Sequence, residues 1–68
     1  MAKCKQSLTN DMYTLFCTHE ALCHEYWILR RKGEHEIAEL LRQAAVKVAD
    51  RIKDIHAELL IREATGYE

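Results

Sequence analysis

Apolar side chains recur along the first half of the chain with the spacing of a helix that packs along its length on another helix. The steps between them alternate between four and three residues, as they do in the a and d seam of a coiled coil. This first seam consists of Leu8, Met12, Leu15, His19, Leu22, Tyr26 and Leu29. The pattern predicts one continuous helix over about residues 8–32.

The second half of the chain carries another apolar series, which predicts a second helix over about residues 34–64. The series consists of Ile37, Leu41, Ala44, Val48, Ile52, Ile55 and Leu59, and Ala45 widens it. From Leu41 onward the steps run three, four, four, three and four, which is closer to an eleven-residue than to a seven-residue repeat. Its alanines, Ala44 and Ala45, allow close approach of the backbones, and we expect Leu15, Phe16 and Leu22 of the first helix to provide bulk opposite them.

Glycine marks the boundary between the two helices, because the chain has no proline and only two glycines, Gly33 and Gly66. Gly33 fits the left-handed position that ends a helix. The first helix has competent N-terminal caps in Ser7, Thr9 and Asn10. One long helix that bends at Gly33 is an alternative, because an isolated glycine costs only about 1 kcal/mol relative to alanine. We favour a hairpin, since a single helix would leave both apolar series without a partner.

The predicted domain spans residues 1–68, and its fold class is all-α. Sixty-eight residues lie near the lower limit for a core that folds alone, and two helices cannot enclose one. We therefore expect a two-helix antiparallel hairpin that pairs as a homodimeric four-helix bundle. In size and layout such a dimer resembles the RNA-binding helical hairpins that control plasmid copy number. The resemblance extends to no individual residue.

A second face of the first helix carries aromatic and polarisable side chains. Tyr13, Cys17, His24 and Trp27 follow one another at steps of four, seven and three, interrupted by Glu20. At 100° per residue, the centre of this face lies roughly 150° from the first seam. Tyr and Trp gathered on one face are typical of an interaction surface. Two interpretations stay open: the face closes the dimer, or it docks a partner protein.

One basic cluster, Arg30, Arg31 and Lys32, directly precedes the predicted turn. Cations are expected there, because the last turn of a helix presents unpaired carbonyl groups and the negative end of the helix dipole. The net charge of −1 gives the chain no general attraction to nucleic acid. Binding of phosphate or RNA by this cluster, with Tyr26 or Trp27 as a stacking platform for bases, is therefore the second hypothesis.

His19 and Cys23 stand four residues apart on the first helix, the spacing of two zinc ligands on one helical face. His35 lies beside the turn, and His56 is displaced from the level of His19 by about nine residues, or roughly 14 Å. Only a symmetry mate would therefore complete a metal site. We expect His19 to be hydrogen-bonded inside the bundle, and the protein to hold no metal and no other cofactor.

The sequence offers no set of catalytic residues. Cys23 and His24 are adjacent and therefore point about 100° apart on a helix, so His24 cannot deprotonate Cys23. The sequence also contains no glycine-rich loop that could cradle a phosphate group. We expect a protein that is not an enzyme.

The remaining composition bears on the cellular setting. No apolar run approaches the roughly 20 residues of a membrane span, and no secretory signal is recognisable. The three cysteines fit reduced thiols, so we expect a cytoplasmic protein.

The leading hypothesis is a small dimeric interaction protein, a regulator or inhibitor of the phage or plasmid type that binds another protein. The alternatives are an RNA- or nucleotide-binding hairpin and a metal-stabilised assembly module.

Overall fold

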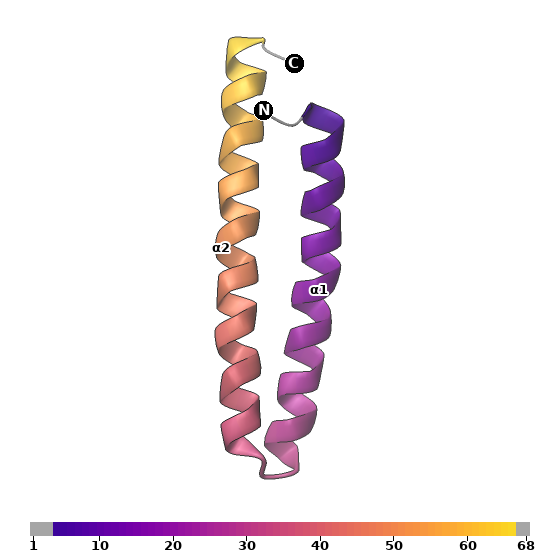
Figure 1. The fold of residues 1–68 in the computed structure, drawn as a ribbon, viewed down its shortest axis with the longest axis vertical. Coiled ribbons are helices and arrows are strands. Elements are labelled where there is room, and N and C mark those ends of the chain that lie inside the picture. Colours follow the sequence, from indigo (N-terminus) through magenta and orange to yellow (C-terminus); the bar gives the residue numbers. More distant parts are fainter. Residues whose placement is uncertain (1–3, 67–68) are drawn as a thin grey trace.

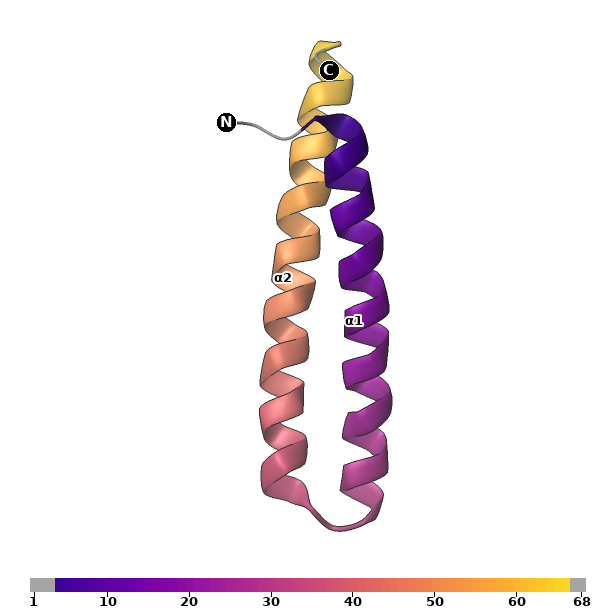
Figure 2. The same cartoon turned by 45° about the vertical axis from the view of Figure 1, so that its right-hand side comes forward.

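The computed structural model describes residues 4–66, which form two long helices joined by a tight turn (Figure 1). Helix α1 spans Lys5–Arg31 and helix α2 spans His35–Thr65. The helices run antiparallel and lie side by side in both views (Figure 2). The resulting rod measures 50 × 20 × 14 Å and confirms the all-helical hairpin expected from the apolar pattern. Within residues 4–66, neither helix is long and apolar enough to cross a membrane.

Two backbone hydrogen bonds close the end of α1 at the turn. The N–H of Glu34 donates to the Leu29 carbonyl at 3.0 Å, and the N–H of Gly33 donates to the Arg30 carbonyl at 3.1 Å. Together they form a Schellman motif, which requires a left-handed residue just after the helix. Gly33 provides it with a φ of 84°. The turn therefore falls on the first of the two glycines.

Helix α1 begins three residues earlier than the apolar pattern suggests. Its N-cap is Cys4, whose side chain forms no capping hydrogen bond. Thr9, one of the expected caps, instead lies inside the helix and donates its hydroxyl to the Lys5 carbonyl at 2.9 Å. A threonine hydroxyl can satisfy either a free N–H at a helix start or a carbonyl one turn back, so the capping residues alone do not place this boundary.

The first seam of α1 faces α2. Leu8 is buried, and the other six residues of the seam are half-buried. In α2 the interface residues recur at alternating steps of three and four, which is a seven-residue repeat. This second seam consists of Ala38, Leu41, Ala45, Val48, Ile52, Ile55, Leu59 and Arg62. Its last member, Arg62, is only 5% exposed and forms an ion pair of 3.1 Å with Glu58.

The second seam differs from the eleven-residue series that the sequence suggested. Ala38 and Ala45 are buried in it, whereas Ile37 is 49% exposed and lies beside the interface. An alanine lets the two backbones approach, which leaves room for the half-buried Leu22 and Leu29, whose levels on α1 are within one residue of those of Ala45 and Ala38. Packing of small against large residues thus places alanine, and not the larger isoleucine, in the seam.

The register between the helices follows from Gly33. Residues at equal distance from Gly33 along the chain stand level with each other in the two helices. A hollow on one side of the hairpin displays this register, because Asp11, Leu15, Arg51 and Ile55 line it together. Asp11 and Ile55 are each 22 residues from Gly33, and Leu15 and Arg51 are each 18.

Candidate interaction surfaces

Among residues 4–66, eight large apolar side chains remain 47–65% exposed, and they divide between the two flanks of the hairpin. Both helices turn by 100° per residue, and they run antiparallel. For this reason the residues that directly follow a seam position point to the same flank of the hairpin in α1 and in α2. Five residues lie there and define the aromatic flank: Tyr13, Phe16, Trp27, Val46 and Leu60. The other three directly precede a seam position and define the aliphatic flank: Ile37, Leu40 and Ile61.

The four residues expected to bind a partner are all exposed, but they do not share one flank. Tyr13 and Trp27 belong to the aromatic flank and are 64% and 54% exposed. Cys17 and His24 stand one position further round α1, where they border a shallow hollow of about 380 Å³. The two aromatic residues therefore lie at the outer edge of the aromatic flank, and the thiol and the imidazole lie next to them on the outer side of α1.

The aromatic flank also contains residues that the sequence pattern did not assign to it, among them Phe16, which was expected to pack against the alanines of α2 and is instead 49% exposed. Phe16, Val46 and Leu60 are each about half exposed and each directly follow a seam residue. A seven-residue frame laid over both helices would have grouped them with Tyr13 and Trp27. The eleven-residue interpretation of α2 hid this relation, because it left Val46 and Leu60 without a constant position relative to the seam.

A cluster of two rings and a guanidinium group lies at the turn end of α1. Arg30 Nη1 donates to the Tyr26 hydroxyl at 2.7 Å. The guanidinium carbon lies 5.9 Å from the centre of the Tyr26 ring and 5.6 Å from that of Trp27, within cation–π range. The two rings pack edge to face with their centres 5.1 Å apart. All three residues of the basic cluster are exposed, and Arg30 is in addition held on aromatic rings.

His19 and Cys23 contact each other within α1. Cys23 Sγ lies 3.8 Å from Nδ1 and 3.9 Å from Nε2 of the His19 ring, and both residues are half-buried. The contact is a weak hydrogen bond within one helix. No group of three or more His, Cys, Asp and Glu side chains in the described part of the chain could hold a metal ion. The hairpin thus brings together two of the ligands that zinc would need.

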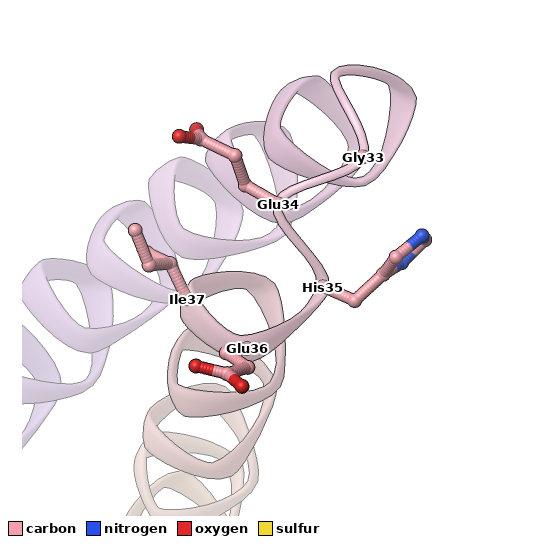
Figure 3. Close-up of a pocket in the computed structure, with 5 residues that line it drawn as sticks. All are labelled: Gly33, Glu34, His35, Glu36 and Ile37. Atoms are coloured by element: carbon pink, nitrogen blue, oxygen red, sulfur yellow. The ribbon is translucent and has the colours of Figure 1, made fainter.

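The turn forms a hollow of about 460 Å³, lined by the consecutive residues Gly33–Ile37 (Figure 3). Glu34 and His35 project to different sides of the chain. A ligand site requires polar groups that converge on one point. The polar side chains of Glu34 and His35 therefore do not converge on one point in this hollow.

Charged residues also line the aromatic flank, and one pair on it is already joined. Arg42 Nε donates to both carboxylate oxygens of Glu39, at 3.0 and 2.9 Å. The hydrogen bond with Arg42 lowers the pKa of the Glu39 carboxyl, so this carboxylate stays ionised at neutral pH. Both side chains are exposed, and such pairs add little to stability. Their charges are nevertheless available to an approaching partner.

Comparison of the chain with models of protein families, with curated proteins and with solved structures finds no match. A proposal for the function therefore rests on the surfaces of the hairpin. These surfaces are an aromatic flank, an aliphatic flank and a basic aromatic cluster at the turn.

Proposed function

We propose that the chain is a small dimeric interaction protein, a regulator or inhibitor of the type that phages and plasmids encode, which binds another protein and has no catalytic activity. The observation that supports this proposal is the exposure of large apolar side chains on two opposite flanks of one small hairpin. Exposed large apolar side chains on one face of a small protein are typical of sites for protein association. Two flanks provide one surface for self-association and one for a partner.

The aromatic flank is the surface for self-association. Among residues 4–66, the hairpin buries only five apolar side chains, which is a small core for an independently stable fold. Those five are Leu8, Ala38, Ala45, Ile52 and Ile55. A second hairpin laid on the aromatic flank covers the rings of Tyr13, Phe16 and Trp27 and converts two thin hairpins into a four-helix bundle.

The aliphatic flank is the surface for the partner protein. It points away from the aromatic flank and therefore stays open when two hairpins pair. Leu40 and Ile61 are its most exposed members, at 65% and 64%. A two-fold dimer presents this flank twice, which gives a partner with two equivalent sites an advantage in avidity.

Affinity capture from the native host tests this proposal. The wild type, a Leu40→Glu/Ile61→Glu double variant and an Ala57→Glu control are compared, with captured protein and nucleic acid both identified. Ala57 is exposed and adjoins no seam residue, so its change adds a carboxylate outside both flanks. We expect one protein to be retained by the wild type and the control and to be lost from the double variant. Retention by all three chains, or capture of nucleic acid alone, would contradict the proposal.

The cluster of Tyr26, Trp27 and Arg30 supports a second candidate function, the binding of RNA or a nucleotide. A guanidinium held against an exposed indole can bind a phosphate while a base stacks on the ring. Its test is the triple variant Arg30→Gln/Arg31→Gln/Lys32→Gln. RNA binding predicts absorbance at 260 nm in the purified protein and an affinity that the triple variant abolishes, with a smaller salt dependence for each lost phosphate contact.

A further inference from the structure

We propose that a second copy of the chain packs antiparallel on the aromatic flank, with the two-fold axis crossing the hairpin at the level of Glu20 and Val46. The inference rests on the proposed homodimer and adds the position of its axis and the contacts across it. An isologous interface requires that residue i of one subunit meets residue j of the other while j meets i. Both exposed helix faces satisfy this requirement around one level.

Helix α1 is self-complementary around Glu20. Tyr13 and Trp27 lie on the aromatic flank at seven residues, or two helical turns, on either side of Glu20. An antiparallel two-fold through Glu20 therefore brings Tyr13 against Trp27 of the partner subunit, and Trp27 against the partner's Tyr13. Two aromatic pairs form where each hairpin alone leaves its rings half exposed.

Helix α2 is self-complementary around Val46, and there the symmetry concerns charge. Glu39 and Lys53 both directly follow a seam residue, seven residues before and after Val46, and they carry opposite charges. The same axis sets Val46 against its own copy and brings Glu39 opposite Lys53 of the partner subunit, twice in each dimer. Complementary charges across an interface select its register.

The two centres of symmetry agree with each other. Glu20 and Val46 are each thirteen residues from Gly33, so they stand level in the hairpin by the register that its side hollow displays. A single two-fold axis must cross both helices at one level. The exposed face of α1 and the exposed face of α2 each indicate the same level for this axis. The rival dimer, with both turns at one end, pairs α1 with the partner's α2. In the rival dimer Glu39 lies level with the partner's Trp27, and Lys53 lies level with the partner's Tyr13. Glu39 and Lys53 therefore form no ion pair with each other in that arrangement.

Charge reversal in mixed dimers tests the position of the two-fold axis. Glu39→Lys and Lys53→Glu each set like charges opposite each other in a homodimer, so each should raise the dimer Kd roughly tenfold. Mixing the two variants restores both opposite pairs, so the heterodimer should form preferentially, with a Kd near that of the wild type. Loss of the Glu39–Arg42 pair cannot explain the weaker Lys53→Glu homodimer, because both of its subunits keep that pair, and one subunit of the heterodimer still lacks it. Lys47→Glu, an exposed control on the other side of α2, should leave the Kd unchanged.

A cross-link gives a second measurement that needs no charge on the flank. On a two-fold axis a residue faces its own copy, so Val46→Cys should form a covalent dimer on mild oxidation in a chain with Cys4, Cys17 and Cys23 changed to Ser. Ala57→Cys in the same background should not.

Glu20→Gln should lower the dimer Kd severalfold, because it removes two carboxylates that face each other at the axis.

The outcomes separate this inference from the proposed function. A wild-type chain that sediments as a monomer at every accessible concentration contradicts the homodimer itself. A wild-type dimer whose charge-reversal variants show no preference for each other, and whose Val46→Cys variant does not cross-link, overturns the placement of the axis and leaves the dimer standing. Preferential heterodimers together with the Val46→Cys cross-link support the antiparallel arrangement.

Discussion

Trp27 is the exposed side chain best prepared for an interface. Its indole is fixed by an edge-to-face contact with Tyr26 and by the guanidinium of Arg30, while 54% of its surface is exposed. A side chain already held in place loses little conformational freedom when a partner covers it, which is a property of aromatic hot spots. The proposed dimer covers this ring with Tyr13 of the partner subunit.

The Trp27→Ala change should therefore cost the dimer about 3 to 5 kcal/mol of stability, as removal of a buried tryptophan does. The wild-type emission should be blue-shifted at micromolar concentration and should move to the red on dilution below the dimer Kd. Emission that is red-shifted and readily quenched at all concentrations would instead assign the ring to a partner. In that case the same change should keep the dimer and weaken partner binding by roughly 2 kcal/mol.

The contact between His19 and Cys23 leads to a prediction about metal. Each residue already has the other as a hydrogen-bond partner within α1, so the pair needs no ion to be satisfied. Incubation with a chelator should leave the Tm unchanged, and added zinc should raise it little. The control is Cys23→Ser, which should respond in the same way. A chelator-induced loss of more than a few degrees that disappears in Cys23→Ser would show a site shared between subunits.

At the scale of the helices, most of the hairpin follows from the sequence. The heptad spacing of α1 and the position of Gly33 suffice to predict two antiparallel helices. The seam of α2 was harder to place, because hydrophobicity ranks Ile37 above its neighbour Ala38, whereas close packing against a leucine requires the smaller side chain. The aromatic flank is defined by the residues that directly follow a seam position. Val46 can therefore be assigned to this flank only when the seam of α2 is known.

The turn itself allows a quantitative test. Gly33 has a φ of 84°, and a Cβ added there would meet no atom within 4 Å. Gly33→Ala therefore introduces backbone strain without a steric clash, and it should lower the free energy of unfolding by about 1 to 2 kcal/mol. Chemical denaturation measures this change. Gly66→Ala is the matched control, since Gly66 has a similar φ of 71° at the end of α2, where fraying should reduce the cost.

At the scale of the whole molecule, the hairpin is a rod with one strong seam and two flanks that water still reaches. Its length of 50 Å provides a long contact surface, while its width of 20 Å leaves no interior away from the seam. Pairing of two such rods creates the interior that one lacks. For this reason folding and assembly should be coupled, and the oligomeric state should respond to changes in the seam as well as on the flanks.

If folding and assembly are coupled, a change in the first seam should affect both the mass and the helicity of the protein. Sedimentation or light scattering at micromolar concentration should give about twice the chain mass of 8.0 kDa. Leu22→Asp places an unpaired charge in the half-buried middle of the first seam, which should cost several kcal/mol and unfold or dissociate the protein. Ala57→Asp, the same charge at an exposed position, should change neither mass nor helical content. A compact, stable monomer formed by the wild type, or a Leu22→Asp variant that keeps its mass and helicity, would show that the hairpin is stable without a second copy.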